Sequence, residues 1–258
     1  MAAPRILIFS GYGLNCEEET AAAFELAGGR AEIVHVNDLI DGGKKMKNYQ
    51  ILAFPGGFSY GDDTGSGKAY ANKVRNHLED DLQRFVDHGG LVIGICNGFQ
   101  ILTNLGLLPG ALTFNKGARY IDRWVDIEIE GRSPWLSGIK RISLPIAHGE
   151  GKFVLEAEEL DELRSKGQIA ARYVKGEICR YHDLEANPNG SLEDIAGITA
   201  QEGRILGLMP HPERALWTSM SPDYQFLKEK SGRQGKKLAK IGPGLNIFQN
   251  AIKFSQKS

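Results

Sequence analysis

The sequence has 258 residues, 41 % of them hydrophobic, which is enough for a substantial core and is not typical of a disordered protein. Its 31 Lys and Arg residues balance 32 Asp and Glu residues, so the net charge of -1 gives no reason to expect a nucleic acid or an anionic membrane as a partner. The three cysteines show no Cys-x-x-Cys spacing, which argues against a structural zinc site. The sequence has neither a secretory signal pattern at its start nor an apolar run long enough to cross a bilayer, so we expect a cytoplasmic protein with reduced thiols.

Short apolar runs alternate with longer helical patterns in the first hundred residues. The predicted strands are 5–10, 31–36, 50–54 and 91–95, and the predicted helices are 15–27, with Asn15 as N-cap, and 68–87. Buried strands separated by helices imply a parallel sheet that is covered on both faces. Such sheets carry their active sites at the carboxyl ends of the strands.

The pattern changes after about residue 120, where short strand-like segments are separated by turns. We predict strands at 125–130, 142–147, 153–155 and 169–173, a hairpin of 198–200 and 205–209, and a final helix at 244–254. The fold class expected from both halves is α/β: a mostly parallel central sheet flanked by helices, with an antiparallel strand extension. We expect one domain over residues 1–258, with a basic insertion at about 215–242.

The strand at 91–95 is followed by Gly94-Ile95-Cys96-Asn97-Gly98, a Gly-x-Cys-x-Gly turn. Such a turn between a buried strand and a helix holds its central residue in a strained, exposed position, and the helix N-terminus favours the thiolate. The motif therefore predicts a cysteine nucleophile at Cys96. The alternative is a small apolar residue that ends a core strand.

A cysteine nucleophile needs a base and a pocket for the oxyanion. His211 follows a predicted strand, and Glu213, two residues later, would lie on the same side of an extended segment and orient the imidazole. His148 is the rival base, and a plain turn histidine is the structural alternative for His211. The N–H groups of Gly57 and Asn97 are candidates for the oxyanion hole, although Gly57 also fits a simple tight turn.

Two glycine-rich segments invite a nucleotide-binding interpretation, and both are incomplete. Gly11-Tyr12-Gly13 follows the first strand, but the third glycine of the dinucleotide fingerprint is replaced by Cys16. The segment 65–69 resembles a phosphate loop, but its upstream glycine is one residue too far away and no Ser or Thr follows Lys68. We therefore expect no nucleotide cofactor and no metal bound by this chain.

Several segments around Cys96, Gly57 and His211 resemble the class I, triad-type glutamine amidotransferases, and more narrowly the glutaminase subunits of phosphoribosylformylglycinamidine synthase. The segments that carry the resemblance are Pro55-Gly56-Gly57, Phe58-Ser59-Tyr60-Gly61-Asp62, Cys96-Asn97-Gly98-Phe99-Gln100-Ile101-Leu102, Gly106-Leu107-Leu108-Pro109-Gly110, His148-Gly149-Glu150-Gly151 and Met209-Pro210-His211-Pro212-Glu213-Arg214. The resemblance implies that Gly56 and Gln100 bind glutamine and that 115–123 lies near the pocket. It also implies a larger synthetase subunit that uses ATP and Mg²⁺, and a small third subunit.

The chain departs from the compact bacterial members of this family at two places. Residues 63–68 replace a stretch that usually contains an arginine, and the basic insertion is absent from compact members. The insertion is either a solvent-exposed surface segment without a specific role, or an element that docks on the synthetase or binds the phosphate of its substrate. Three other functions remain open: the glutaminase of another synthetase, a related single-domain cysteine hydrolase, and a non-catalytic regulatory subunit.

Overall fold

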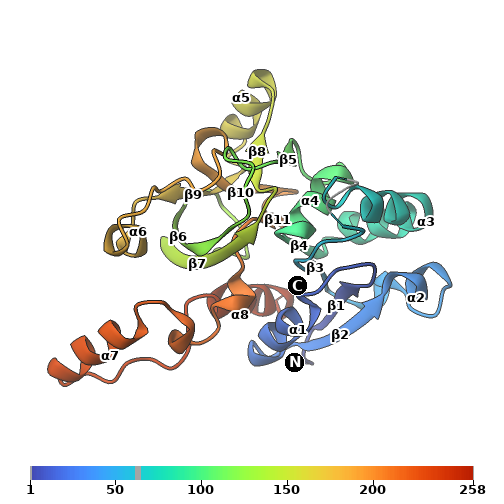
Figure 1. Ribbon diagram of the computed structural model, residues 1–258. Helices are drawn as coiled ribbons and strands as arrows, with labels where there is room; N and C mark the ends of the chain where they lie inside the picture. Colours follow the sequence, from blue (N-terminus) through green and yellow to red (C-terminus); the bar gives the residue numbers. More distant parts are fainter. Residues whose placement is uncertain (1, 62–64, 258) are drawn as a thin grey trace.

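A nine-stranded sheet runs through the molecule in this computed structural model, which describes residues 2–61 and 65–257 (Figure 1). Its strands lie in the order β2-β1-β3-β4-β11-β10-β9-β6-β7. They are β1 (Arg5–Ser10), β2 (Arg30–His35), β3 (Ile51–Phe54), β4 (Leu91–Ile95), β6 (Ile121–Ile129), β7 (Arg141–His148), β9 (Ile169–Val174), β10 (Ile195–Ala200) and β11 (Ile205–Leu208). A separate antiparallel pair consists of β5 (Ala111–Thr113) and β8 (Lys152–Val154).

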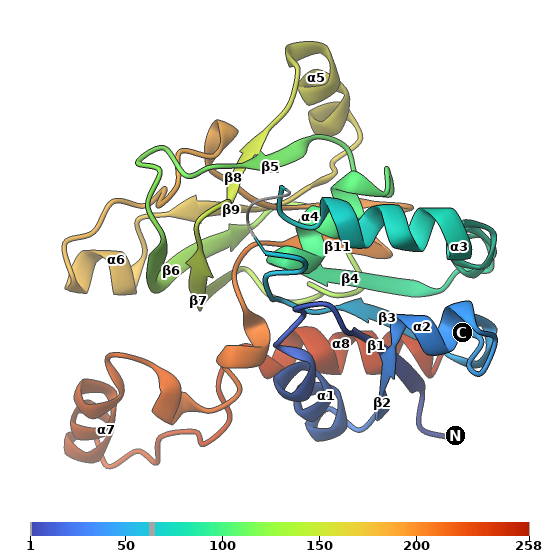
Figure 2. The ribbon, with the colours of Figure 1, turned by 45° about the vertical axis from the view of Figure 1, so that its right-hand side comes forward.

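The strands β2, β1, β3, β4 and β11 pair in parallel and form one half of the sheet. Helices α1 (Glu17–Leu26) and α8 (Leu245–Ser255) cover one face of this half, and α3 (Lys68–Asp87) and α4 (Asn97–Asn104) cover the other (Figure 2). Because both faces are covered, β3 and β4 are buried along their whole length, as their unbroken apolar sequences predict. The short helix α2 (Val36–Ile40) follows β2 directly.

The other half of the sheet is antiparallel and consists of β10, β9, β6 and β7. Along β7, buried residues alternate with partly exposed ones, the pattern of a strand with one covered face. Helices α5 (Ala157–Ser165) and α6 (Glu177–Tyr181) belong to this half. Since β7 is the last strand of the sheet, its outer edge is available for contacts with loops.

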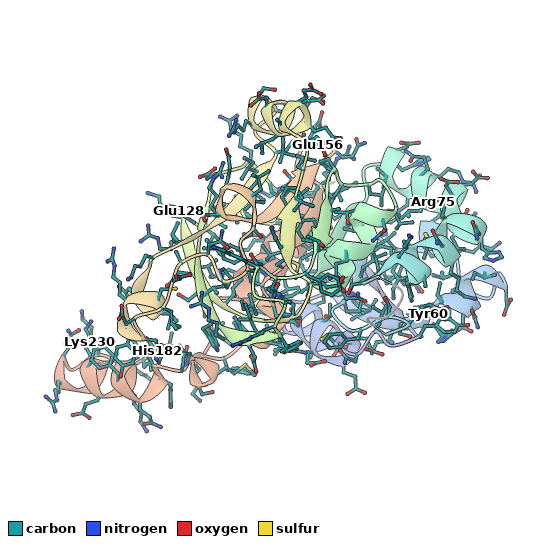
Figure 3. All side chains as sticks on the ribbon, turned by 45° about the horizontal axis from the view of Figure 1, so that its top comes forward. Tyr60, Arg75, Glu128, Glu156, His182 and Lys230 are labelled. Atoms are coloured by element: carbon teal, nitrogen blue, oxygen red, sulfur yellow. The ribbon has the colours of Figure 1, made fainter. Side chains whose placement is uncertain are left out.

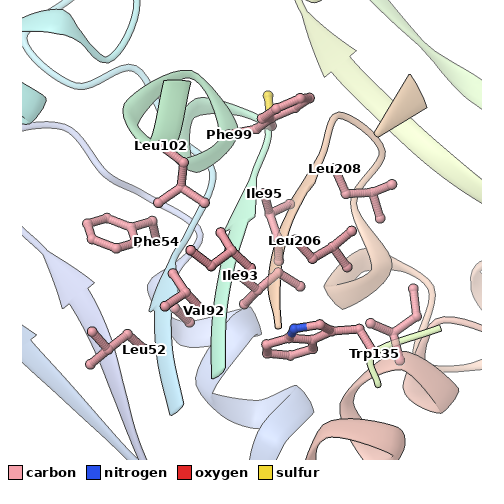
Figure 4. Close-up of a cluster of buried hydrophobic side chains, with 14 of the residues drawn as sticks. Leu52, Phe54, Val92, Ile93, Ile95, Phe99, Leu102, Trp135, Leu206 and Leu208 are labelled. Carbon is pink, nitrogen blue, oxygen red and sulfur yellow. The ribbon is translucent and has the colours of Figure 1, made fainter. Parts of the chain in front are cut away.

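The main core joins the central strands to the helix that follows β4 (Figure 4). Phe54, Ile93 and Leu206 come from three adjacent strands, and Phe99 and Leu102 pack on them from α4. Burial of a large apolar side chain contributes about 1.5–3 kcal/mol. The start of α4 is therefore anchored firmly beside the end of β4.

The basic insertion forms an arm that extends away from the sheet (Figures 1 and 2). A β-bridge between Trp217 and Ile241 closes its base, and α7 (Tyr224–Arg233) lies at its far end. In Figure 3 the labelled residues Lys230 and His182 mark α7 and α6 at the same end of the molecule. The rings of Phe226 and Tyr181 are 5.9 Å apart, so the arm touches α6.

The predicted fold class is confirmed, and the bounds predicted for β1, α3 and β4 coincide with the structure. The first helix begins at Glu17 with Cys16 as its N-cap, so the prediction of Asn15 at that position was wrong. Four helices were not predicted: α2, α5, α6 and α7. The extent of the domain stays a prediction. In the part of the chain that the structure describes, no helix has the length and apolar character needed to span a membrane.

Candidate active site

Cys96 stands at a strained turn between β4 and α4. Its φ of 51° and ψ of -105° are uncommon for a residue with a side chain, as expected for a nucleophile elbow. The flanking glycines are required for close packing. A Cβ atom at Gly98 would lie 1.8 Å from the carbonyl oxygen of Phe54, and one at Gly94 would lie 2.6 Å from that of Gly98. The turn predicted from the sequence is therefore present, with Cys96 as the N-cap of α4. Cys96 is only 5 % exposed, so the prediction of an exposed side chain was wrong.

His211 and Glu213 form a buried hydrogen-bonded pair. The distance between His211 Nδ1 and Glu213 Oε1 is 2.5 Å, and the two side chains are 2 % and 0 % exposed. The prediction of an extended segment was wrong, because Pro212–Arg214 forms a short 3-10 helix. Proline at the first position of this turn has no N–H to lose and fixes φ near the helical value. The predicted contact therefore exists, but a tight turn brings it about.

The charge environment of His211 favours the imidazolium. Burial lowers the pKa of His211, but the charge of Glu213, and then that of Cys96, outweigh burial and raise this pKa well above its ordinary value. His211 Nε2 is buried and has no hydrogen-bond partner among the described residues. A base that is charged, oriented from one side and open at its other nitrogen can donate a proton to a leaving group.

The outer edge of β7 contacts both the predicted nucleophile and the predicted base. The N–H of His211 donates to the carbonyl oxygen of Pro145 at 2.8 Å, and the thiol of Cys96 lies 3.8 Å from the carbonyl oxygen of Ala147. Carbonyl groups two residues apart in a strand point the same way. The antiparallel half thus contributes to the site, although Cys96 and His211 follow strands of the parallel half.

The predicted oxyanion donors lie on two backbone segments next to Cys96. Gly57 is paired with Leu14 in an isolated β-bridge, and a Cβ atom at Gly57 would lie 2.6 Å from the carbonyl oxygen of Gly13. The N–H of Gly57 donates in none of the backbone hydrogen bonds given by the described residues. Asn97 is the first residue of α4, where an N–H has no acceptor within the helix. Both groups fit the predicted role, which stays a prediction.

The two residues expected to bind glutamine are both engaged inside the protein. The carbonyl oxygen of Gly56 accepts from the N–H groups of Asn15 and Cys16, at 3.2 and 3.1 Å. The side chain of Gln100 donates to the carbonyl oxygen of Glu150 at 2.6 Å and accepts from Asn97 at 2.7 Å. Gln100 therefore ties the turn at 148–151 to the helix behind Cys96. Direct contact of Gly56 and Gln100 with glutamine stays a prediction.

His148, the rival base, is buried and neutral. Its pKa is lowered to about 3, first by burial and then by the charge of His211. The amide nitrogen of Asn115 donates to the carbonyl oxygens of Arg119 and His148, so the Asn115 oxygen faces His148 Nδ1, at 3.0 Å, as an acceptor. Nδ1 must then carry the hydrogen. With no carboxylate partner and this pKa, His148 is not suited to protonate a leaving group, whereas Asn115 holds it beside the site.

One neighbour of the predicted base, Cys16, was not predicted from the sequence. Its sulfur, a ring nitrogen of His211 and a carboxylate oxygen of Glu213 all lie within 4.8 Å of one another. These three atom types can bind zinc, but ligands of one tetrahedral ion with bonds of about 2.1 Å lie roughly 3.4 Å apart. The 2.5 Å between His211 and Glu213 is a hydrogen-bond distance. Cys16 and His211 are far apart in sequence, so no spacing pattern could have revealed their contact.

The glycine-rich segments that resembled nucleotide motifs have packing roles. A Cβ atom at Gly13 would lie 2.6 Å from the carbonyl oxygen of Phe58, and one at Gly67 would lie 2.8 Å from the backbone nitrogen of Ile101. Both glycines thus let two backbone segments approach closely. The departure noted at residues 63–68 falls partly on Asp63 and Thr64, which, like Asp62, lie outside the described residues.

A cavity of about 800 Å³ lies elsewhere, at the amino ends of β3 and β4. Residues lining it include Met46, Arg84, His88 and Leu91. It includes none of the predicted site residues. Because parallel sheets carry their active sites at the carboxyl ends of the strands, we place the chemistry at Cys96 and not in this cavity.

Comparisons with known proteins agree with this geometry. Residues 3–255 match the family model of the CobB/CobQ-like glutamine amidotransferase domain. The chain is 49 % identical to phosphoribosylformylglycinamidine synthase subunit PurQ of Methanococcus maripaludis, over 98 % of both chains, and 42 % identical to the protein of that name from Dehalococcoides mccartyi, over 100 % of both. A solved structure of PurLQS from Thermotoga maritima contains a similar chain, with a TM-score of 0.75 and 30 % identity over 98 % of this chain and 99 % of that one.

Proposed function

Because this chain belongs to the CobB/CobQ-like glutamine amidotransferase family, we propose that it is the glutaminase subunit of phosphoribosylformylglycinamidine synthase, in purine biosynthesis. The observation that carries the proposal is Cys96 on its strained turn, next to the buried pair of His211 and Glu213. Relatives similar over their full length carry the name of this subunit.

The reaction follows from the positions of these groups. The thiolate of Cys96 attacks the side-chain carboxamide of glutamine, and the N–H groups of Gly57 and Asn97 stabilise the oxyanion. His211, oriented by Glu213, gives its proton to the departing nitrogen, so that ammonia leaves and a glutamyl thioester remains. Water, deprotonated by His211, then attacks the thioester. Glutamate leaves, and the thiolate and imidazolium are restored.

The ammonia has to reach a partner before it is lost as ammonium. We place the ATP- and Mg²⁺-dependent step, in which formylglycinamide ribonucleotide becomes formylglycinamidine ribonucleotide, on a larger synthetase subunit, with a small third subunit in the complex. The likeness to a chain of PurLQS supports a synthetase partner. The proposal assigns this chain no cofactor of its own. It places the reaction in the cytoplasm, where a free nucleophilic thiol stays reduced.

The arm, at about 215–242, is the segment that we assign to docking on the synthetase. It exposes aromatic side chains, including Phe226 at 50 %, beside six basic residues between 228 and 240. Exposed aromatic side chains are typical of protein interfaces, and a cluster of basic side chains can complement an acidic surface of the partner. Deletion of 224–240 is expected to weaken complex formation, as measured by analytical ultracentrifugation. Unchanged complex formation and unchanged glutamine-dependent activity would rule out docking by the arm.

The test of the function is reconstitution with the synthetase, ATP, formylglycinamide ribonucleotide and either glutamine or ammonium. Cys96→Ala should abolish amidine formation from glutamine and leave ammonium-dependent formation intact. Cys179→Ala, which removes another buried thiol, is the matched control and should retain both. Glutamine use by Cys96→Ala would refute the mechanism. Glutaminase activity without amidine formation would instead favour the glutaminase of a different synthetase.

A further inference from the structure

The sulfur of Cys16 lies directly beside the catalytic base. The residue is 1 % exposed and stands at the N-terminus of α1, in a loop that also contacts the predicted oxyanion segment. A Cβ atom added at Gly56 would lie 2.7 Å from His211 Cε1 and 3.1 Å from Cys16 Sγ, so these two side chains pack against the same backbone atom. Cys16 is therefore part of the wall against which the imidazole rests.

The partner of this sulfur is Arg214, the residue after Glu213. Arg214 Nη2 donates to Cys16 Sγ at 2.9 Å. Although burial lowers the pKa of Arg214, the contact with Cys16 and the charge of Glu213 outweigh burial and raise it, so the guanidinium stays charged. A charged guanidinium ordinarily pairs with a carboxylate, through two hydrogen bonds where geometry allows.

The charge of the Glu213 carboxylate acts on Arg214, but the two form no ion pair among the described residues. Oε1 of Glu213 is hydrogen-bonded to His211, whereas Oε2 is buried and has no hydrogen-bond partner among the described residues. A buried carboxylate oxygen without a partner costs free energy, so a guanidinium free to reach it would do so.

Cys16 is itself fixed from several sides. Its N–H donates to the carbonyl oxygen of Gly56 at 3.1 Å, and its carbonyl oxygen accepts from the hydroxyl of Thr20 at 2.7 Å. The thiol is 3.4 Å from the Asn15 side-chain oxygen, which can accept its hydrogen. The sulfur lone pairs thus remain for the guanidinium and the His211 ring, at a position fixed by the backbone.

We propose that Cys16 is a positioning residue: its sulfur holds the Arg214 guanidinium away from Glu213, so that the carboxylate serves His211 alone. The proposal rests on the role of His211 in the proposed function. Without the sulfur, Arg214 pairs with Glu213, and the carboxylate then orients His211 less well and stabilises its charge less. The imidazolium needed for ammonia release becomes less populated, while the binding of glutamine is unaffected.

The test is a double-mutant cycle of Cys16→Ala and Arg214→Met, measured as glutaminase activity in the reconstituted complex. Cys16→Ala is expected to lower kcat about tenfold with KM within about twofold, and to move the alkaline limb of the pH profile to lower pH. In the Arg214→Met background the same substitution should cost less than about twofold, because no guanidinium is left to move. Cys16→Ser, which keeps an acceptor, should recover most of kcat. Cys179→Ala controls for loss of a buried thiol.

Equal losses from Cys16→Ala in both backgrounds would overturn the proposal in favour of simple packing, and an unchanged kcat would show that the sulfur is dispensable. NMR titration of the His211 ring supplies a readout that needs no substrate. Cys16→Ala should lower the pKa of His211 more when Arg214 is present than in Arg214→Met, where only the direct contact of the sulfur with His211 is lost. If the parent protein lacked glutaminase activity, the proposed function would fail, whereas the ring titration would still decide the role of Cys16.

Discussion

Substituting Gly56 by Ala tests how closely the base must be held. The added Cβ would lie 2.7 Å from His211 Cε1, whereas an ordinary contact begins at 3.4 Å, so the ring must retreat by about 0.7 Å. The ring cannot retreat freely, because Nδ1 is bound to Glu213 at 2.5 Å and the backbone N–H to Pro145 at 2.8 Å. Catalytic groups tolerate displacements of only about 0.5 Å, and a misplacement of about 1 Å costs roughly a hundredfold in rate.

We therefore expect Gly56→Ala to lower the kcat for glutamine about 10- to 100-fold, and overpacking to lower the free energy of unfolding by about 1–3 kcal/mol. The assay is amidine formation by the reconstituted complex from glutamine and, separately, from ammonium. Thermal unfolding reports stability. Ammonium-dependent turnover should not change, and Gly43→Ala, whose Cβ would make only an ordinary contact of 3.4 Å with the carbonyl oxygen of Asp38, should affect neither assay. A kcat within twofold of the parent would show that the imidazole position is less restricted than the packing indicates.

Three further substitutions test other parts of the site. In Glu213→Gln the pKa of His211 should fall, because the charge that raises it is removed. The alkaline limb of the pH profile of kcat should therefore move to lower pH, and kcat should drop about 10²–10⁴-fold. An unchanged alkaline limb would contradict the pairing of His211 with Glu213. In His148→Asn the alkaline limb should stay within about 0.3 pH unit of its position in the parent protein, because His148, with a pKa of about 3, is neutral over the whole pH range of the assay. A shift as large as that of Glu213→Gln would identify His148 as the base. Gly98→Ala, which places a Cβ 1.8 Å from the carbonyl oxygen of Phe54, should destabilise the protein by about 3 kcal/mol or more, and an unchanged melting temperature would contradict the close approach of α4 to β3.

Local patterns in the sequence account for much of the fold and for the nucleophile. The apolar run at β4 and the glycines around Cys96 act within a few residues, so they predict both the strand and the strained turn. Helix α7 was not predicted, because none of its residues is buried and it therefore has no apolar face that would repeat with the 3.6-residue period of a helix. The pairing of His211 with Glu213 was predicted for the wrong reason, since Pro212 starts a 3-10 turn rather than stiffening a strand.

Contacts between segments distant in sequence could not be predicted, because each half of such a contact is an ordinary residue on its own. Cys16 appeared only as the residue that spoils a glycine motif, and its partner Arg214 lies near the other end of the chain. Likewise, nothing local links Asn115 to His148, yet that hydrogen bond determines which nitrogen of His148 carries the hydrogen. A single sequence contains no periodic signal for pairs of this kind.

The edge position of β7 explains why the antiparallel half contributes to the proposed active site. In an interior strand the outward carbonyl groups would be paired with another strand, but at the edge those of Pro145 and Ala147 are left to face the N–H of His211 and the thiol of Cys96. Proline is tolerated there because an edge strand does not need every N–H. His211 follows β11 in the parallel half, so its backbone is held by one half of the sheet and anchored to the other. The geometry of the base therefore depends on how β7 packs against the loop after β11, and substitutions at that junction should affect kcat before they affect glutamine binding.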